Sequence, residues 1–240
     1  MEDQSSNLFL SSLSRANYDR LASRSTQVEL PLHTILYEEE ESPRYGYFLT
    51  LGLASIITPM SNGESVEGGF IGHEGVVGGL HLLGPALLST KCVMQLSGMA
   101  LRIPYLELQK AFANFPEIHS RMLEFVQQQA IMVGQIAGCN RLHGSEQRLI
   151  RWLLSAQDRT HSSDLKFTHQ YLAEMIASQR TTITVIARDL QERGFIRYSR
   201  GVVHIVDRQG LEKAACDCYA ITKQLYASLY GRNAPTAASP

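Results

Sequence analysis

The sequence predicts an α+β protein with a β-rich N-terminal domain, one long central helix and a C-terminal winged helix-turn-helix. Three observations support this prediction. Short β-prone runs separated by glycine and proline fill residues 28–103, a heptad pattern runs through 122–140, and residues 167–206 read as two helices followed by a hairpin. Many short strands joined by Gly/Pro turns are typical of an antiparallel sandwich or barrel. The expected domains are a β domain at 1–115, a dimerisation helix at 116–141, a winged helix-turn-helix at 142–215, and a C-terminal helix with a disordered tail at 216–240.

Composition and charge indicate a globular protein with two unlike halves. The chain has 240 residues, 44% of them apolar, and a net charge of −1. Residues 141–240 carry 14 basic and 9 acidic side chains, whereas residues 1–140 carry 8 basic and 14 acidic ones. A basic C-terminal half beside an acidic N-terminal half fits a DNA-binding unit attached to a unit that does not touch DNA. The chain has no run of 18 apolar residues and no basic segment at its start, so we expect a cytoplasmic protein without membrane contact.

The N-terminal half is expected to begin with a helical lead-in over residues 8–25. From Val28 onward the pattern changes to short strands. The predicted strands are Thr34–Tyr37, Tyr45–Leu51, Ala54–Thr58, Ser65–Phe70, Lys91–Leu96 and Met99–Ile103.

A long helix with a regular seam follows. Pro116 suits the first turn of a helix. The seam residues are separated by 4, 3, 4, 3 and 4 positions, which is a heptad repeat and favours a coiled-coil homodimer. They are Met122, Val126, Gln129, Val133, Ile136 and Asn140. The alternative is a single long helix packed on its own chain.

Residues 167–206 predict a helix-turn-helix with a wing. Thr168 can cap the first helix, whose apolar side chains Leu172, Met175 and Ile176 share one face. The second helix turns Ile183, Ile186, Ala187 and Leu190 inward and ends at Gly194, which suits a helix C-terminus. Phe195–Tyr198 and Val202–Val206 then form a hairpin around the turn Ser199–Gly201. The alternative is a helix pair of an ordinary all-α domain.

In a helix-turn-helix the second helix enters the DNA major groove, so its outer face should read bases while flanking residues meet phosphates. The expected DNA-binding residues are Thr168, His169, Gln170, Ser178, Gln179, Arg180, Thr181, Thr182, Thr184, Arg188, Arg197 and Arg200.

This segment resembles the DNA-binding domain of Crp/Fnr-type bacterial transcription regulators. The resemblance extends upstream through residues 139–154 and, more weakly, over the N-terminal half, so that it covers about residues 15–215. It implies that the β domain is a jelly-roll sensor similar to cyclic-nucleotide-binding domains. It also implies a homodimer formed through the long helix, near-palindromic double-stranded DNA sites, and RNA polymerase as a partner.

The recognition helix departs from the pattern of many family members, Ser-Arg-Glu-Thr-Val-x-Arg. Here residues 179–185 read Gln-Arg-Thr-Thr-Ile-Thr-Val. Arg180 matches the first arginine and could contact guanine, and Thr182 matches the motif threonine as a phosphate contact. Thr181 replaces the glutamate and Val185 replaces the second arginine. The base preference should therefore differ from that of typical members.

The effector pocket of cyclic-nucleotide-binding members is altered here. The corresponding positions read Gly78, Gly79 and Leu80, then Leu88, Ser89 and Thr90. The ribose-binding glutamate and the phosphate-binding arginine are replaced, by Gly79 and Leu88 respectively. An arginine can form bidentate hydrogen bonds with the phosphate of a cyclic nucleotide. Because that arginine is replaced, we expect DNA binding without cAMP. The alternative is a sensor whose DNA binding depends on an unidentified effector, such as a cyclic nucleotide, haem or a redox signal.

Metal and cofactor chemistry is not expected. An iron–sulfur sensor needs clustered N-terminal cysteines, and the first 91 residues contain none. His73 and His81 could bind haem or metal, but no other residue near them completes a ligand set. Cys216 and Cys218 could be redox-active or bind metal, but the favoured interpretation is two cysteines on a C-terminal helix with no histidine or cysteine partner nearby.

The two alternative classes of protein are an enzyme and a ligand-binding protein. An enzyme is disfavoured because the chain has no nucleophile elbow, Walker loop or paired-histidine metal motif. A ligand-binding protein that uses its helix-turn-helix to contact proteins would lack salt-sensitive DNA affinity.

Overall fold

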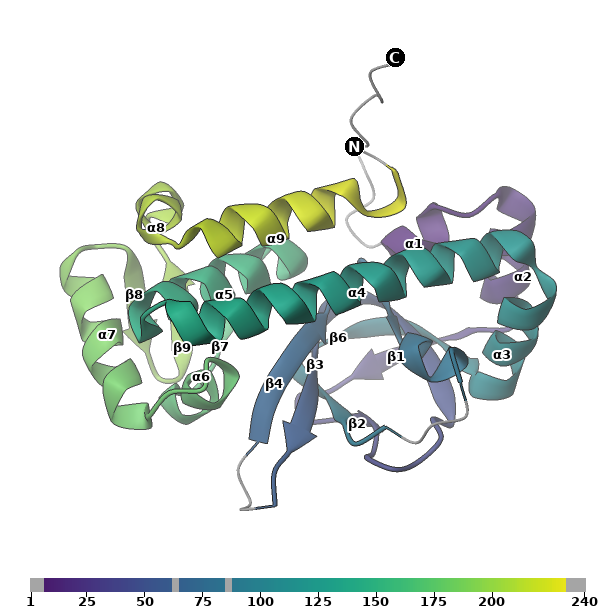
Figure 1. Ribbon diagram of the computed structural model, residues 1–240, viewed down its shortest axis with the longest axis horizontal. Coiled ribbons are helices and arrows are strands. Elements are labelled where there is room, and N and C mark those ends of the chain that lie inside the picture. The colour runs from purple at the N-terminus through teal and green to yellow at the C-terminus, as the bar shows by residue number, and fades with distance from the viewer. Residues whose placement is uncertain (1–6, 62–64, 85–87, 232–240) are drawn as a thin grey trace, which may run out of the picture.

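The computed structural model describes residues 7–61, 65–84 and 88–231. A β domain and a smaller helical domain lie side by side, and the long helices α4 and α9 run along both of them (Figure 1). The expected disordered tail falls on residues 232–240, outside the described residues. None of the helices in the described ranges is long and apolar enough to cross a membrane.

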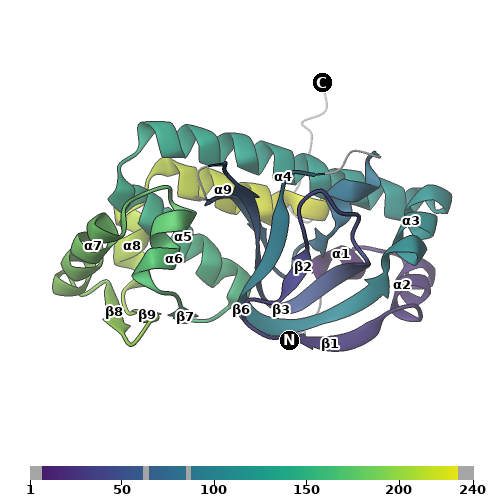
Figure 2. The ribbon, with the colours of Figure 1, turned by 90° about the horizontal axis from the view of Figure 1, so that it is seen from below.

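The β domain is built on one antiparallel sheet that curls around a hydrophobic core (Figure 2). Its strand order is β1-β6-β3-β4, with β2 paired to β6 and β5 paired to β3. The helical lead-in is confirmed as two helices, α1 and α2. The bounds are α1 Leu8–Ser11, α2 Arg15–Ala22, β1 Thr26–Leu30, β2 Ile35–Tyr37, β3 Tyr45–Pro59, β4 Ser65–Ile71, β5 Val76–Val77, the 3-10 helix η1 Gly79–Leu82, and β6 Lys91–Pro104.

Two long strands replace four predicted short ones. The pairs Tyr45–Leu51 with Ala54–Thr58, and Lys91–Leu96 with Met99–Ile103, are continuous as β3 and β6. The two strands bend together, with register shifts between Leu49 and Ala54. Gly52 has φ +89°, and a Cβ on Gly98 would lie 2.0 Å from the carbonyl oxygen of Leu51. Glycine therefore bends this strand pair rather than ending it.

Helices α3 (Tyr105–Asn114) and α4 (Pro116–Leu142) follow the sheet, and Pro116 begins α4 as predicted. The second domain comprises α5 Ser145–Thr160, β7 Asp164–Lys166, α6 His169–Met175, α7 Arg180–Glu192, β8 Ile196–Ser199, β9 Val202–Ile205 and α8 Arg208–Ala214. The helix-turn-helix and its hairpin are as the sequence predicts, and β7 adds a third strand to the hairpin. Its own core contains Trp152, Ile183 and Leu190, all buried.

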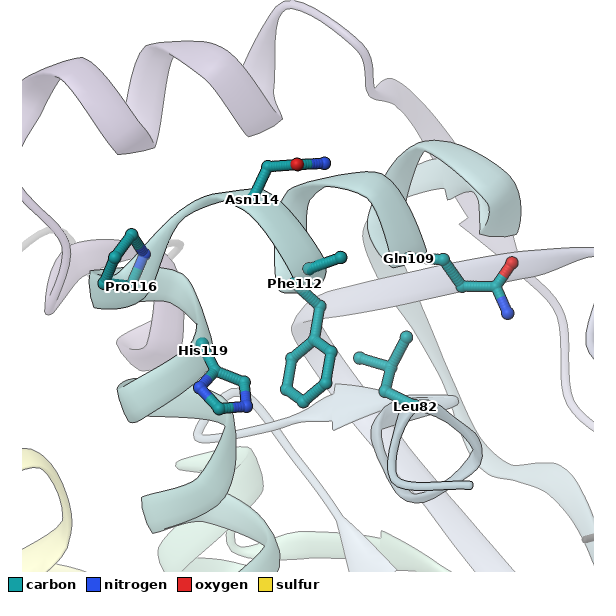
Figure 3. Close-up of a pocket in the computed structure, with 7 residues that line it drawn as sticks. Leu82, Gln109, Phe112, Asn114, Pro116 and His119 are labelled. Atoms are coloured by element: carbon teal, nitrogen blue, oxygen red, sulfur yellow. The ribbon is translucent and has the colours of Figure 1, made fainter. Parts of the chain in front are cut away.

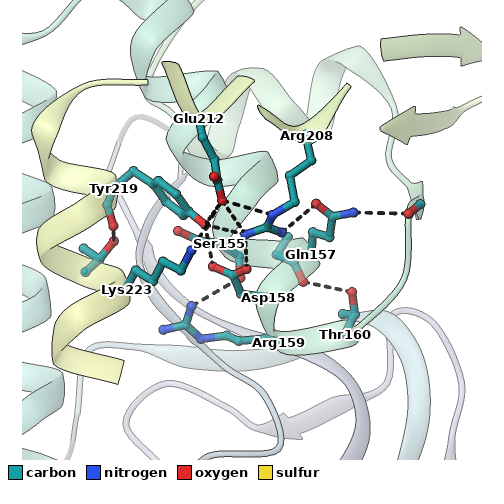
Figure 4. A network of polar contacts seen from close by, with 12 residues as sticks. Ser155, Gln157, Asp158, Arg159, Thr160, Arg208, Glu212, Tyr219 and Lys223 are labelled. Carbon is teal, nitrogen blue, oxygen red and sulfur yellow. Dashed lines mark hydrogen bonds and ion pairs between the residues drawn. The ribbon is translucent and has the colours of Figure 1, made fainter. Parts of the chain in front are cut away.

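The apolar pattern of residues 208–230 predicts one terminal helix, but the segment is broken at Ala215 and Cys216 into α8 and α9 (Asp217–Ser228). A 3-10 turn, η2 (Leu229–Gly231), follows. A polar network fixes the angle between them (Figure 4). The Arg208 guanidinium at the start of α8 donates to Asp158 of α5 at 2.6 Å and to the Tyr219 hydroxyl of α9 at 2.6 Å. Glu212 pairs with Arg208 at 3.0 Å. These contacts direct α9 back along α4 toward the β domain.

The two domains meet at buried polar groups. The Arg159 guanidinium of α5 pairs with Glu74 of the β domain at 2.9 Å, and both side chains are at most 5% exposed. Close by, the Trp152 indole N–H donates to Glu67 on β4 at 2.8 Å, and the Ser55 hydroxyl also donates to Glu67. Tyr171 of α6 lies within hydrogen-bonding distance of the same Ser55 hydroxyl, at 3.2 Å. The helix-turn-helix is thereby docked on the sheet.

Burial raises the pKa of Glu67 from its usual 4.5 to about 7, although its bonds to Ser55 and Trp152 and nearby arginines oppose the shift. A carboxyl whose pKa is higher in the folded state stabilises the fold fully below the unfolded pKa and loses this contribution as pH rises through the folded pKa. Glu67→Gln removes the charge, keeps an oxygen to accept from Trp152, and places an amide N–H that can donate to the Ser55 hydroxyl. We expect it to gain thermal stability over the wild type as pH rises from about 5 to about 8. The gain should reach the order of 2–3 kcal/mol. Calorimetric melting across this range measures it, and a Glu67→Gln curve parallel to that of the wild type would contradict the assignment.

Candidate functional site

The recognition helix α7 presents its N-terminal turn to solvent. Gln179 is its N-cap residue, and Arg180, Thr181 and Thr184 are exposed at its start. Ile183, Ala187 and Leu190 are buried, so the inward and outward faces agree with the prediction. Thr182 is half-buried. The N-terminal turn of such a helix is the part that meets base edges in a major groove.

His169 has a different environment from the exposed phosphate contact that we expected. Its ring stacks on Tyr198 with centroids 4.2 Å apart, and its Nδ1 lies 3.0 Å from the Thr184 hydroxyl. Burial, and secondarily the Arg180 charge, lowers the pKa of His169, so the ring is neutral at pH 7. Nε2 is shielded from solvent. His169 of α6 therefore contacts both α7 and the wing. It is also a hydrogen-bond partner of the Thr184 hydroxyl.

Other expected DNA-binding residues surround the recognition helix. The Thr168 hydroxyl caps α6 by accepting from the Tyr171 N–H at 3.1 Å, as predicted. Ser178 lies between the helices, with its hydroxyl 3.1 Å from that of Ser145. Gln170 is exposed and donates to Glu174 at 2.8 Å.

The cations of this surface differ in their partners. Arg180, Arg197 and Arg200 are exposed and form no ion pair with any described residue. Arg188 is paired with Glu192 at 3.5 Å, with both side chains largely in water, where such pairs contribute little. Arg200 occupies the wing turn with φ +50°. Arg180 and the two wing arginines are thus available to phosphates or bases.

Val185 was not among the expected DNA-binding residues, yet it is 68% exposed on α7. An apolar side chain on the outer face of a recognition helix suits contact with a thymine methyl group. One signal for this role was present in the sequence, because Val185 stands at the second arginine position of the family pattern.

Helix α4 packs two residues of the predicted dimer seam against its own chain. Met122 and Ile136 are buried against their own chain, so they are not open to a partner in this structure. Val133 is exposed, and Val126, Gln129 and Asn140 are partly buried. The exposed side of the helix instead carries Leu123, Ala130, Val133, Gly134, Ala137 and Gly138.

A cavity of about 410 Å³ lies between the β domain and α4. Gly78, Gly79, Leu80 and Thr90 line it as expected, whereas Leu88 and Ser89 do not. Helix α4 contributes Phe125, Val126, Gln129, Ala130 and Val133. No Lys, Arg, Asp or Glu is among the described lining residues, so the cavity offers no cation to a phosphate.

His81 is the notable polar group of this cavity. Both of its ring nitrogens are shielded from solvent, and neither has a hydrogen-bond partner among the described residues. Its ring meets that of Tyr37 edge-on at 4.7 Å. Burial lowers the pKa of His81, so the ring is a neutral donor and acceptor. His73, by contrast, lies at the domain interface with its nitrogens 2.9 Å from the Arg159 carbonyl oxygen and 2.8 Å from the Tyr226 hydroxyl. The two histidines do not share a site.

A second hollow, of about 480 Å³, lies where α3 turns into α4 (Figure 3). Leu82, Phe112 and His119 point into it, and Gln109, Asn114 and Pro116 surround them. Its described lining residues include no Lys, Arg, Asp or Glu, and none of them belongs to the predicted effector pocket.

The expectation that Cys216 and Cys218 lack partners is wrong. The fold brings Cys139 and His143 beside them, with the four potential ligand atoms all within 4.8 Å of one another. Sequence reasoning missed the cluster because more than 70 residues separate its two halves.

The chain thus combines a sheet-based domain with an apolar cavity, a long helix, and a helix-turn-helix followed by a hairpin. Residues 147–214 match the family of Crp-like helix-turn-helix domains. No curated protein matches the sequence. The whole chain resembles solved structures of Crp/Fnr-type transcription regulators, and residues 147–214 form a Crp-like helix-turn-helix domain.

Three of these structures match about four fifths of this chain. The c-di-GMP responsive global regulator CLP of Xanthomonas campestris is 16% identical, with a TM-score of 0.66 over 81% of this chain and 100% of that chain. FixK2 of Bradyrhizobium japonicum is 14% identical, with a TM-score of 0.67 over 80% and 98%. A transcriptional regulator of the CRP family from Thermus thermophilus, TTHB099, is 21% identical, with a TM-score of 0.65 over 78% and 96%. They establish the shared fold.

The unpaired imidazole of His81 yields a prediction about stability. Replacing it with leucine removes buried polar atoms without partners, each of which costs about 1–3 kcal/mol. We expect His81→Leu to raise the melting temperature of the purified chain. The control His119→Leu, at an exposed position, should change stability by no more than about 0.5 kcal/mol. A destabilised His81→Leu would mean that the imidazole nitrogens already have hydrogen-bond partners.

Proposed function

We propose that the protein is a sequence-specific DNA-binding transcription regulator of the Crp/Fnr type, which binds near-palindromic promoter sites as a homodimer and without cAMP. The observation that supports this most strongly is the exposed N-terminal turn of α7, with Arg180 and Thr181 in water beside a wing that carries Arg197 and Arg200. Side chains of these types are suited to contact base edges and phosphates.

The homodimer is proposed through the exposed face of α4. Ala130, Gly134 and Ala137 follow one another at spacings of four and three, and Leu123 lies seven positions before Ala130. A Cβ built on Gly134 or Gly138 would meet nothing within 4 Å, so a second helix has room to approach closely. A twofold axis along this face would present two recognition helices to half-sites about one DNA turn apart.

Independence from cAMP is supported by the chemistry of the cavity. A cyclic nucleotide carries a phosphate anion, and the described lining residues include no cation to pair with it. His81 is neutral because burial lowers its pKa. Desolvating an unpaired phosphate there would be costly.

The second candidate function is effector-dependent DNA binding, which the apolar cavity and unpaired His81 favour. A small apolar molecule with one polar group could bond to His81 while touching Val126, Ala130 and Val133 of α4. Such a ligand would act on the helix that is proposed to join the two subunits.

Selection of bound sequences from random DNA by the purified chain tests the proposed function. Enrichment of an inverted repeat with half-sites about 10 base pairs apart is the expected result. Enrichment only after small molecules are added would favour the second candidate. No enrichment under either condition would reject both.

For the selected site, we expect Arg180→Ala to weaken binding by roughly 1–3 kcal/mol and to relax specificity at one base position. A titration against single-base variants of the site measures both effects. Arg15→Ala, an exposed arginine of the β domain, should leave affinity unchanged. An unaltered base preference in Arg180→Ala would remove this residue from the reading surface.

Charge on the proposed dimer face should separate the subunits. We expect Ala137→Glu to convert the dimer to monomer in light scattering and to weaken binding to a double site while affinity for a single half-site persists. Ser120→Glu, an exposed position near the start of α4, should leave the dimer intact. An intact dimer in Ala137→Glu would place the interface elsewhere.

A further inference from the structure

Four potential metal ligands meet at the junction of α4, α5 and α9, and we call them the thiol cluster: Cys139, His143, Cys216 and Cys218. Cys139 lies on the last turn of α4 and His143 is the residue that caps this helix. Cys216 is the N-cap residue of α9 and Cys218 lies in its first turn. Figure 1 shows the C-terminal end of α4 near the start of α9.

The distances within the thiol cluster are those between ligands on one tetrahedral zinc ion. The sulfur atoms of Cys139 and Cys216 are 3.7 Å apart, and the sulfur of Cys218 is 3.5 Å from Nδ1 of His143. Zinc bonds of about 2.3 Å to sulfur and about 2.0 Å to nitrogen would set tetrahedral ligands roughly 3.8 Å (S to S) and 3.5 Å (S to N) apart. All four ligand atoms lie within 4.8 Å of one another, so small movements close the remaining edges.

The surroundings of the thiol cluster suit a closed metal site. The three cysteines are at most 6% exposed, and His143 is partly covered. Gln135 donates its side-chain N–H to the Cys218 sulfur at 3.1 Å, a bond that a thiolate would strengthen. Nε2 of His143 is 3.6 Å from the Asp217 carboxylate, which could orient the ring for binding through Nδ1.

The choice of metal follows from the ligand set. Three thiolates and one imidazole in a tetrahedral arrangement select zinc among the common divalent ions, and four protein ligands leave no open position. A disulfide is the competing use of buried cysteines, but it requires sulfurs about 2.0 Å apart and would leave the third cysteine and the histidine without a role.

We propose that Cys139, His143, Cys216 and Cys218 bind one structural zinc ion, which fixes the C-terminal end of α4 to the start of α9. His143 and Gly144 also connect α4 to α5, the first helix of the Crp-like domain. The ion would therefore set the direction in which the chain leaves α4. This inference does not depend on the proposed function, because metal content can be measured without DNA.

The test uses the full chain, purified without chelators or metal-affinity tags after growth with added zinc. We expect one zinc per chain by elemental analysis. Replacement with cobalt should give the visible absorption bands of tetrahedral thiolate coordination. Cys216→Ser should lose the bound zinc, whereas Cys92→Ala, which alters a buried cysteine of β6 outside the thiol cluster, should retain it. Asp217→Asn should weaken zinc affinity about 10–100-fold in competition with a chelating dye.

Several outcomes would overturn the proposal. A wild-type chain that takes up neither zinc nor cobalt, or a Cys216→Ser chain that keeps its zinc, would exclude the site. Two fewer free thiols than the sequence contains would indicate a disulfide, and iron with inorganic sulfide would indicate an iron–sulfur cluster instead of a single ion. The cobalt spectrum of the wild type decides the matter even if a variant fails to fold.

Discussion

The buried ion pair between Arg159 and Glu74 is the interaction on which the arrangement of the two domains depends. Both side chains are almost fully removed from water, so loss of either partner would leave a buried unpaired charge. Aromatic rings reinforce the arrangement, because the Arg159 guanidinium lies 4.5 Å from the Phe70 ring and 5.0 Å from that of Tyr226. One residue of α5 thereby touches the sheet and α9 at once. The Crp-like domain consequently has a defined position on the β domain rather than a flexible tether.

Helix α4 has three faces with different surroundings. One face packs into the β domain, where a Cβ on Gly75 would lie 2.4 Å from the Phe125 ring. A second face lines the apolar cavity, and a third is exposed and rich in small residues. Its C-terminal end belongs to the thiol cluster. Any molecule that fills the cavity would therefore contact the helix that leads into the Crp-like domain. A shared element of this kind is what allosteric coupling requires.

Sequence reasoning predicted the features that depend on local interactions and missed those that depend on residues far apart in the chain. The helix-turn-helix and its wing were predictable because capping by Thr168, the apolar spacing and the glycine turns all act over a few residues. The bend at Gly52 and Gly98 was not, because a glycine that ends a strand and one that bends it look alike until the partner strand is known. The heptad pattern of α4 did not reveal that Met122 and Ile136 pack against their own chain, because a repeat of apolar positions does not say which surface a helix faces. The thiol cluster and the Arg159–Glu74 pair join residues more than 70 positions apart, which no local pattern encodes.

The return of α9 along α4 has a consequence for how the chain acquires its structure. Leu229 and Tyr230 are buried in the same core as Phe9 and Phe48, and the Tyr230 hydroxyl donates to the carbonyl oxygen of Glu74. The β domain leaves the ribosome before α9, yet its core closes only with side chains translated more than 120 residues after its last strand. During synthesis, part of the apolar surface of the sheet therefore stays uncovered until α9 has been made. Such a surface is bound by chaperones and favours aggregation over folding. Docking of α9 and η2 is therefore also the step that completes the core of the β domain.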